Sequence, residues 1–538
     1  MAHKQLLFRG EAREKILRGA TALAEAVAIT LGPKSKSVLI EKEWGHPIVC
    51  NDGVTIAKEI VLKDPEENLG VQTLREAAER TGDAVGDGTT TATLLAHAIF
   101  ADGVRNIAAG ASAIDLKRGL DRGLYAAVAS IRSSSRPVTS KKEKVQVATV
   151  SAHNNAQIGA IVADAVEQVG AEGAISVEEA RGTETNLELV QGLQIDRGFL
   201  SPYFVTDTER MEVALEDPLI LLYDKKISSV QELVPLLEQV LKAGKPLLII
   251  AEDVDGDALA TLVLNKLRGA ITCAAAKAPG YGENRRAAME DIATLTGGQL
   301  IAEEIGVKLE TVVLTQLGRA GRVVLDKDTT TIISGGGDSN VVQARCNELR
   351  RRIDSTTSDY DRDKLKERLA KLLGGVAVIR VGALSEAEMK SRKEAFEDAI
   401  SATKAAVAEG IVPGAGLPLL RAIAAIDLEA GKCEGDERTG VLILRHALEA
   451  PSRQIALNSG ADGGVVVEKM VSGTGDFGFD ASTGKYLDLV EAGIIDATKV
   501  VRVALENAVS VAGVLLLTEA TLTKVPEPKV EEPRIPYE

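Results

Sequence analysis

The run GDGTTT at residues 86–91 has the composition of a phosphate-binding helix start. Small residues precede the apolar helical stretch ATLLAHAIF, so their backbone N–H groups would point at one spot, where the helix dipole adds positive potential. Asp87 would repel a bare phosphate, but a carboxylate here can hold Mg²⁺ against phosphate oxygens. An ordinary helix start capped by Asp and Thr has the same composition, so the motif alone leaves both interpretations open.

The elements around this run must bring further polar groups to it. Residues 11–30 follow helical spacing, and Leu31-Gly32-Pro33 ends that helix because Pro cannot extend the hydrogen-bond ladder. Residues 37–42 and 46–50 read as short strands that lead into a turn at residues 51–53, and an Ala-rich helical region covers residues 68–132. A second helix-rich region covers residues 385–524, including a helix at residues 392–408.

The composition is that of a large globular protein. The 538 residues suggest three or four domains. Only 3% of the residues are aromatic, so Ala, Val, Leu and Ile must form most of the core. The net charge of −15 argues against a nucleic-acid partner and against an anionic membrane surface, because both require a basic face.

The sequence lacks the patterns of several other common functional sites and targeting segments. The four cysteines are far apart and form no CxxC pair, which argues against a zinc site and a disulfide framework. There is no Walker-A motif, and the GxGxxG match at residues 473–478 does not join a strand to a helix. We see no signal-peptide pattern at the start and no apolar run near the ~20 residues of a membrane span, so we expect a cytoplasmic protein.

Several ordered motifs resemble those of group I chaperonins of the GroEL type. They include TLGPK (30–34), NDGVT (51–55), GDGTTT (86–91), RGFLSPYF (197–204), KPLLIIAED (245–253), DIATLTGG (291–298), DTTT (328–331), EDA (397–399) and the region around Asp496. The resemblance covers nearly the whole chain and leaves out about the last fifteen residues.

The resemblance implies a multidomain chaperonin fold of class α+β/α/β. A mostly helical equatorial domain would comprise residues 1–136 and 410–524, and a small α/β intermediate domain residues 137–191 and 376–409. An α/β apical domain would comprise residues 192–375. Residues 525–538 are rich in Pro and charge, and we expect them to be disordered.

The resemblance also implies an ATP site. Asp87 matches the Mg²⁺ ligand, and Asp52 and Asp398 match the carboxylates around the attacking water, although an arbitrary helical Asp is more often a solvated surface residue. The other implied nucleotide-binding positions are Thr30, Leu31, Gly32, Pro33, Asn51, Gly88, Thr89, Thr90, Thr91, Ala415, Asp480, Ala481, Ser482 and Asp496. A K⁺ ion joins ATP and Mg²⁺ as an expected cofactor if the family uses the carbonyl at Asn51 for a monovalent cation.

Three positions depart from the family pattern near this site. Ala415 stands where the family has the middle of three glycines, Asn51 where it has Lys, and Asp480 where it has Asn. The methyl group of Ala415 would narrow the purine pocket, and Asp480 would add a charge near the base. The family's Gly-Gly-Met ending is also absent.

A second group of residues is apolar. Phe199, Tyr203 and Phe204 lie close together, and two apolar stripes follow at residues 230–241 and 259–267. Such stripes usually face a core, but these look wide for one buried face. The resemblance implies that eight positions line the mouth of a cavity: Phe199, Tyr203, Phe204, Val234, Leu237, Leu259, Val263 and Leu264. An exposed apolar surface of this kind would bind non-native polypeptides and the mobile loop of a GroES-type co-chaperonin.

The resemblance implies a homo-oligomer of two stacked seven-membered rings. Arg105, Ala109, Glu434, Arg453 and Asp462 match the ring–ring contact region, although they could also be ordinary surface residues. Arg197 with Glu386 matches a family ion pair, whereas Asp207 and Asp255 place acid against acid where the family has a pair. We therefore expect an ATP-driven folding machine. The alternatives are a ring-forming paralogue with a restricted role and, much less favoured, a metabolic ATP-dependent enzyme.

Overall fold

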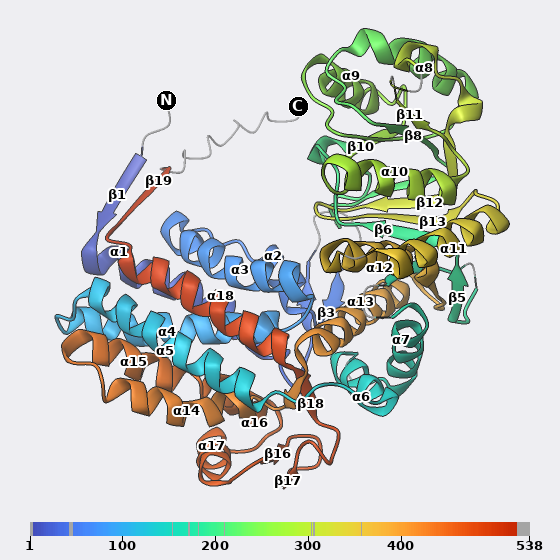
Figure 1. Cartoon of the computed structure of the whole chain (residues 1–538). Helices are drawn as coiled ribbons and strands as arrows, with labels where there is room; N and C mark the ends of the chain where they lie inside the picture. Colours follow the sequence, from blue (N-terminus) through green and yellow to red (C-terminus); the bar gives the residue numbers. More distant parts are fainter. Residues whose placement is uncertain are drawn as a thin grey trace, which may run out of the picture. The chain divides into compact units, whose positions relative to one another are not determined.

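The computed structural model describes residues 4–524 except 42–46, 153, 171–172, 181, 209, 303, 305–306 and 357 (Figure 1). The chain forms two compact units. Unit 1 comprises Met1–Ala163 and Lys390–Glu538, and unit 2 comprises Asp164–Met389. Unit 1 therefore joins the two ends of the chain, whereas unit 2 is continuous.

Unit 1 is built mainly from long helices that pack side by side (Figure 1). They are α1 (Arg9–Ala28), α3 (Pro65–Val85), α4 (Thr89–Ala108), α5 (Ala113–Ser134), α14 (Leu417–Ala430), α15 (Gly435–Ala447) and α18 (Thr498–Leu517). Glycines allow some of these backbones to touch. A Cβ atom added to Gly70 of α3 would lie 2.0 Å from the carbonyl oxygen of Ile16 in α1.

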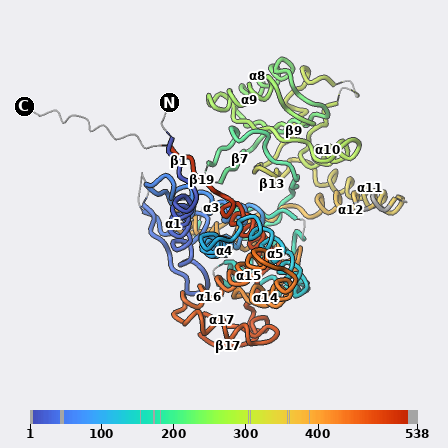
Figure 2. The backbone as a smooth tube through the Cα atoms, turned by 90° about the vertical axis from the view of Figure 1, so that its left-hand side faces the viewer, coloured from blue at the N-terminus to red at the C-terminus, as the bar shows by residue number. Residues whose placement is uncertain are grey.

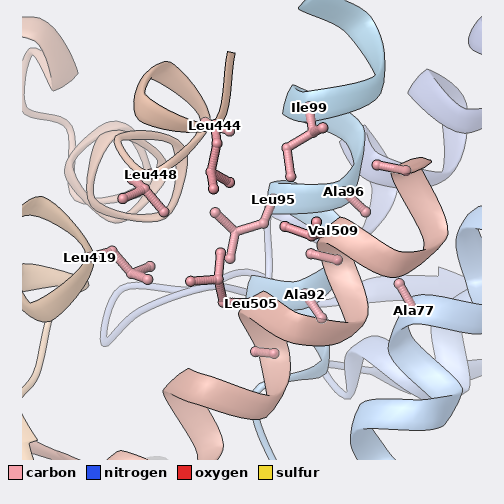
Figure 3. Packing of buried hydrophobic residues seen from close by; sticks show 14 of the residues in the cluster. Ala77, Ala92, Leu95, Ala96, Ile99, Leu419, Leu444, Leu448, Leu505 and Val509 are labelled. Atoms are coloured by element: carbon pink, nitrogen blue, oxygen red, sulfur yellow. The ribbon is translucent and has the colours of Figure 1, made fainter. Parts of the chain in front are cut away.

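The core of unit 1 is aliphatic, as the low aromatic content predicts. In Figure 3, Leu95 of α4 is surrounded by Leu444 of α15 and by Leu505 and Val509 of α18. Phe100 of α4 is one of the few aromatic side chains in this cluster. Interiors built from small side chains stay dense only if the helices approach closely, which fits the helix contact at Gly70.

Shorter elements complete unit 1. Its helices are α2 (Gly53–Glu59), α6 (Lys141–Ser151), α16 (Ala450–Asn458) and α17 (Gly463–Ser472). Its antiparallel pairs are β1 (Lys4–Phe8) with β19 (Ala520–Lys524), β2 (Val38–Ile40) with β3 (Ile48–Cys50), β15 (Ile411–Pro413) with β18 (Ile495–Ala497), and β16 (Phe477–Asp480) with β17 (Lys485–Asp488). Figure 2 shows α16, α17 and β17 near one another at the end of the unit that lies lowest in that view.

Two helices cross from one unit into the other along the chain. They are α7 (Ala156–Val169) and α13 (Glu386–Glu409). The larger part of α13, from Lys390 onward and including Asp398, belongs to unit 1. The contacts of Asp398 described below therefore lie within a single unit.

Unit 2 contains an eight-stranded mixed sheet in the order β10-β9-β8-β12-β13-β6, with β11 beside β8 and β7 beside β12. Its strands are β6 (Gly192–Ile195), β7 (Val213–Glu216), β8 (Leu219–Tyr223), β9 (Leu247–Ala251), β10 (Cys273–Lys277), β11 (Leu300–Ile301), β12 (Gly318–Leu325) and β13 (Thr330–Gly335). Strands β8, β9 and β10 are parallel, and the helices α8 (Val230–Ala243) and α9 (Gly256–Leu267) connect them. Such crossovers cover a sheet and bury its strands, and β8 and β9 are buried along their whole length.

Unit 2 also contains a three-stranded sheet and the helices α10 (Gly282–Thr296), α11 (Ser339–Ser355) and α12 (Asp359–Gly374). The sheet has the order β4-β14-β5, formed by β4 (Ala174–Glu179), β14 (Val376–Val381) and β5 (Asn186–Val190). Buried Asp291 of α10 holds the other two helices, because it accepts hydrogen bonds from Arg345 of α11 at 2.8 Å and from Arg368 of α12 at 2.6 Å.

The helical unit and the α/β unit agree with the predicted fold class. The two unit boundaries, at residues 163/164 and 389/390, fall inside the segments predicted as the intermediate domain. The three-domain division itself stays a prediction. Residues 525–538, which we expect to be disordered, lie outside the described residues.

Helix α18 differs from what the sequence led us to expect. By length and mean hydropathy (1.8), Thr498–Leu517 would qualify as a membrane span, although we expected no such run. However, 67% of its most apolar window is buried inside the structure, and it packs against α3, α4 and α5. The helix is therefore the central core helix of unit 1.

Candidate functional site

The turn between α3 and α4 presents Asp87 in a fixed orientation. Gly86 and Gly88 flank it with φ of 68° and 78°, a region that glycine adopts without steric cost. One carboxylate oxygen of Asp87 accepts a hydrogen bond from the N–H of Gly88 at 2.5 Å, and the other accepts one from the hydroxyl of Ser151 in α6 at 2.7 Å. Helix α4 begins directly after this turn, and its N-cap residue Gly88 has no side chain to cap it.

Asp52 lies at the start of a second helix beside this turn. It caps α2 by accepting hydrogen bonds from the N–H groups of Val54 at 3.3 Å and Thr55 at 2.8 Å. The beginnings of α2 and α4 are in close contact, because a Cβ atom added to Gly53 would lie 2.5 Å from the hydroxyl oxygen of Thr90. The turn predicted at residues 51–53 is therefore a helix start.

The TLGP segment that follows α1 approaches the same helix start. The hydroxyl of Thr30 donates to the carbonyl oxygen of Val27 at 2.8 Å and lies 3.3 Å from the hydroxyl of Thr90. The next turn contains Gly32 at φ 90°. Two short segments, residues 30–33 and 87–91, thus converge on the N-terminus of α4, where the helix dipole favours an anion.

Asp398 of α13 is the third carboxylate of this group. An added Cβ atom on Gly86 would lie 2.3 Å from the Cβ of Ser401, so α13 touches the Asp87 turn within one helical turn of Asp398. Burial, followed by the negative charges of Asp87 and Asp52, raises the pKa of Asp398 well above its ordinary value. The side chain still keeps part of its surface exposed. Asp52, Asp87 and Asp398 therefore share one electrostatic environment.

Asp496 joins this acidic group from the neighbouring strand pair. It lies on β18, directly opposite Val412 of β15. Burial and, to a lesser degree, the charge of Asp87 raise the pKa of Asp496 to about 7. A pKa near 7 for an aspartate means that the surrounding structure disfavours a further negative charge at this point.

Further predicted nucleotide positions lie near β15 and β16: Ala415 is on the loop after β15, Asp480 ends β16, and Ala481 and Ser482 begin the turn to β17. Ala415 has a φ of 58°, a left-handed conformation that is unfavourable for a residue with a Cβ atom. Asp480 accepts hydrogen bonds from the backbone N–H of Ser482 at 2.8 Å and from the hydroxyls of Ser482 and Thr483, each at 2.6 Å. Burial opposes its charge, but these hydrogen bonds outweigh burial and hold the pKa of Asp480 below its ordinary value. Asp480 thus organises the turn of its own hairpin.

The donor set fits Mg²⁺ shared with a phosphate better than a metal held by protein alone. Within the described part of the chain, no group of three or more His, Cys, Asp or Glu side chains could enclose a metal ion. Mg²⁺ commonly binds through one or two carboxylates and completes its shell with phosphate oxygens and water. The unfavourable field that raises the pKa of Asp398 and Asp496 is one that a cation beside Asp87 would relieve.

Unit 2 carries an apolar surface over α8, α9 and the short 3₁₀ helix η1 (Pro202–Phe204). Helix α9 packs against both α8 and η1. Large apolar side chains are exposed on all three elements, namely Tyr203 (63%), Val234, Leu241, Leu264 and Leu267. We call these five residues the apolar surface.

The expectation of exposure is wrong for two of the eight predicted positions. Phe204 is completely buried in the core of unit 2, and Leu237 is only 6% exposed. Helix α8 turns Leu233, Leu237 and Val240 toward the sheet, so the wide stripe is part core and part surface. Phe199, Leu259 and Val263 are partly buried against the same core.

Residues 23–526 match the model of the TCP-1/cpn60 chaperonin family. The chain is also 68% identical over 531 residues to a protein named Chaperonin GroEL 5 from Bradyrhizobium diazoefficiens, and the match covers 99% of this chain and 98% of that protein.

The chain belongs to the chaperonin family. The identity to a GroEL protein over nearly full length further makes it a group I, GroEL-type chaperonin, as the motifs predicted.

Two positions of the chaperonin that match family ion pairs make other contacts within this chain. Asp255 forms an ion pair with Lys226 at 2.5 Å and accepts a hydrogen bond from Ser228 at 2.7 Å, so the acid at this position has found other partners. Arg197 lies over the ring of Tyr281, at 5.9 Å from its centroid. In the part of the chain that the structure describes, Arg197 and Glu386 do not form an ion pair with each other.

Three polar side chains that were not predicted from the sequence support the chaperonin's site. Ser151 binds Asp87, Ser452 of α16 donates to the carbonyl oxygen of Ala415 at 2.8 Å, and Asn458 of α16 donates to the carbonyl oxygens of Ala28 and Leu31 at 2.9 and 2.8 Å. They are distant in the sequence from the loops that they hold, and no motif marks them. Only the tertiary structure could have found them.

Proposed function

We propose that this chaperonin is an ATP-hydrolysing folding machine that captures non-native polypeptides on the apolar surface of unit 2. The observation that carries the proposal is the convergence of Asp52, Asp87 and Asp398 on the uncapped N-terminus of α4. Such a site can bind phosphates and activate water, and it lies in a different unit from the apolar surface.

In the proposed site the chain's own groups bind and orient ATP. The N–H groups at the start of α4 and the hydroxyls of Thr89, Thr90 and Thr91 would donate to phosphate oxygens. The segment from Thr30 to Pro33 would contact the phosphates from the other side. Ala415, Asp480, Ala481, Ser482 and Asp496 would surround the base and the ribose, and the carbonyl of Asn51 would accept K⁺ if a monovalent cation binds.

Asp398 is the proposed base for hydrolysis, and Asp52 would help to orient the attacking water. The water oxygen attacks the terminal phosphorus, and its proton passes to Asp398. The bond between that phosphorus and the bridging oxygen then breaks, which yields ADP and inorganic phosphate. Mg²⁺ held by Asp87 would supply positive charge to the phosphates and bring the pKa of Asp398 back toward that of an ordinary carboxylate.

The apolar surface would bind clients without reading their sequence. Unfolded chains expose apolar side chains, and burying them against the residues around Tyr203 and Leu264 is favourable by the hydrophobic effect. ATP can change this binding only if it binds one arrangement of the protein more tightly than another. We further propose that the chain forms two stacked seven-membered rings in the cytoplasm and works with a GroES-type co-chaperonin.

A refolding assay tests the whole proposal. The purified protein, Mg-ATP and a GroES-type co-chaperonin should recover the activity of an aggregation-prone enzyme diluted from denaturant. Omission of ATP is the control. ATP hydrolysis without recovery would instead support a ring-forming paralogue with a restricted role, and absence of hydrolysis would refute the ATPase. Electron micrographs should show seven-fold end views and two layers in side views.

A further inference from the structure

Helix α16 presents three residues on one face toward the nucleotide loops. Ser452, Ile455 and Asn458 are spaced by three residues, so they share one face of the helix. The first and last of them are about 9 Å apart along the axis at 1.5 Å per residue. Each of the three contacts a segment predicted to bind nucleotide.

Asn458 fixes the end of α1 and the phosphate-side segment that follows it. Its side-chain N–H₂ donates to the carbonyl oxygens of Ala28 at 2.9 Å and Leu31 at 2.8 Å. Its side-chain oxygen accepts a hydrogen bond from Gln454 at 2.8 Å, which sets the orientation of the amide. Carbonyl groups at the end of a helix have few partners within the helix. The N–H of Leu31 supplies one for Ala28 at 3.3 Å, and the amide of Asn458 adds a second support from outside the segment.

Ile455 packs under the same segment. A Cβ atom added to Gly32 would lie 3.2 Å from a methyl group of Ile455, and Gly32 already has a φ of 90°. The segment therefore rests closely on α16 at the turn that leads to Pro33.

Ser452 fixes the purine-side loop. Its side chain is buried, and its hydroxyl donates to the carbonyl oxygen of Ala415 at 2.8 Å. An added Cβ atom on Gly416 would lie 2.5 Å from this hydroxyl. Ala415 and Gly416 both have positive φ, which is unfavourable for Ala415 but not for a glycine, so the loop holds one strained residue directly against α16.

We infer that the face of α16 formed by Ser452, Ile455 and Asn458 sets the spacing between the phosphate-side and purine-side loops, and that Ser452 and Asn458 are positioning residues for nucleotide binding. This inference rests on the proposed ATP site. A single rigid support holds both loops in place before the nucleotide binds. Less conformational entropy of the loops is then lost when a nucleotide contacts both of them.

The test uses the assembled full-length protein and three variants. Asn458→Asp keeps the shape of the side chain but replaces the donor by an acceptor facing two carbonyl oxygens, and Asn458→Ala removes the amide. Ser452→Ala removes the hydroxyl from the other end of the face. Leu457→Ala, on an exposed residue of the same helix, is the matched control. Negative-stain images check that every variant assembles.

The main readouts are the Kd of Mg-ADP by calorimetry and the separate kcat and KM for ATP. Loss of two hydrogen bonds predicts that Asn458→Asp raises the Kd and the KM at least about tenfold. The kcat at saturating ATP should stay within about twofold, because bound ATP orders the loops again. Asn458→Ala should raise the Kd and the KM by a smaller factor, and Ser452→Ala should raise both by about threefold. Leu457→Ala should match the wild type.

The outcomes separate this inference from the proposed function. If the wild type does not bind Mg-ADP, the proposed site itself is wrong. If the wild type binds Mg-ADP and both Asn458 variants bind it with the same Kd as the wild type, α16 is only structural and the inference is overturned. A lower unfolding temperature with unchanged Kd and KM also overturns it. Should Asn458→Asp fail to assemble, Asn458→Ala and Ser452→Ala still decide the question.

Discussion

The acidic site of unit 1 and the apolar surface of unit 2 depend on different kinds of information. In the acidic site, the side chains Asp52 and Asp87 are held by hydrogen bonds to neighbouring backbone and side-chain groups. On the apolar surface, exposure alone decides whether a side chain can bind a client. Tyr203 is exposed and Phe204 is fully buried, although the two residues are adjacent in the sequence. Chemistry that requires particular atoms constrains residue type, whereas hydrophobic capture constrains only surface area.

This difference explains why substitutions should act differently in the two regions. In the acidic site, a change of one side chain removes a charge or a hydrogen bond that no neighbour replaces. On the apolar surface, several residues contribute similar area, so single changes should reduce capture only gradually.

Phe204→Ala should destabilise unit 2 by about 3–5 kcal/mol, because it removes a fully buried ring from the core. Its neighbour Tyr203 is 63% exposed, and Tyr203→Ser should change stability by less than about 0.5 kcal/mol. Only Tyr203→Ser should weaken the binding of a denatured client at unchanged stability. Apparent unfolding temperatures at one scan rate, combined with client binding by light scattering, measure both effects. Equal stability of the two variants would contradict the burial of Phe204 in the core of unit 2.

Asp398→Ala should lower the kcat of ATP hydrolysis about a hundredfold, the lower end of the contribution of a general base. Binding of Mg-ADP should persist, since the phosphates contact α4 and not α13 in the proposed site. The adjacent carboxylate Glu397, which also lies on α13, is the matched control, and Glu397→Ala should keep kcat within about twofold. Single-turnover hydrolysis separates chemistry from product release. Wild-type turnover in Asp398→Ala would remove this residue from the mechanism.

Much of the fold and of the acidic site could be predicted because local patterns encode them. Periodic apolar residues located α1, α8 and α9 to within a few residues. The GDGTTT and TLGP motifs identified the segments that meet at the start of α4. The structure corrected local detail, since residues 51–53 begin α2 and the pairing of β1 with β19 joins segments more than 500 residues apart.

The parts that could not be predicted depend on tertiary contacts. Whether Phe204 or Tyr203 is exposed depends on how η1 rests on α9, and no spacing in the sequence reveals that contact. Ser151, Ser452 and Asn458 support the site from distant helices, and each looks like an ordinary polar residue at a helix end or surface. The apolar helix α18 shows the limit of composition as a guide, because its length and hydropathy also suit a membrane span while its environment is a protein core.

Asp496→Asn should change how the stability of unit 1 depends on pH. Burial and Asp87 raise the pKa of Asp496 in the folded protein to about 7, above the ordinary value of 3.8 for the unfolded chain. Between these two values the unfolded chain releases the proton and the folded protein retains it, so the wild type loses stability as pH rises from about 4 to 7. The Asn variant lacks this loss.

The difference between the two pKa values corresponds to about 4 kcal/mol at pH 8. Asp496 keeps part of its surface exposed, so solvent screening reduces the expected gain of Asp496→Asn over the wild type to about 2 kcal/mol at pH 8, with little gain at pH 4.5. Urea midpoints without nucleotide at the two pH values measure the difference. Asp488→Asn, the same substitution at a partly exposed aspartate on β17, which precedes β18 along the chain, is the matched control. The assignment fails if Asp496→Asn and the wild type respond to pH in parallel.

Ala415→Gly should have the smallest effect, and its sign tests how tightly the purine-side loop is constrained. Ala415 has a φ of 58°, and relief of its Cβ strain should contribute about 1–2 kcal/mol. The more flexible unfolded chain of the Gly variant offsets about 0.4–1 kcal/mol of this gain. The net result should be an apparent unfolding temperature about 1 °C higher by calorimetry. The hydrogen bond from Ser452 to the carbonyl oxygen of Ala415 does not involve the methyl group, so it should persist. A lower unfolding temperature would mean that the methyl group contributes more through packing than its backbone strain costs.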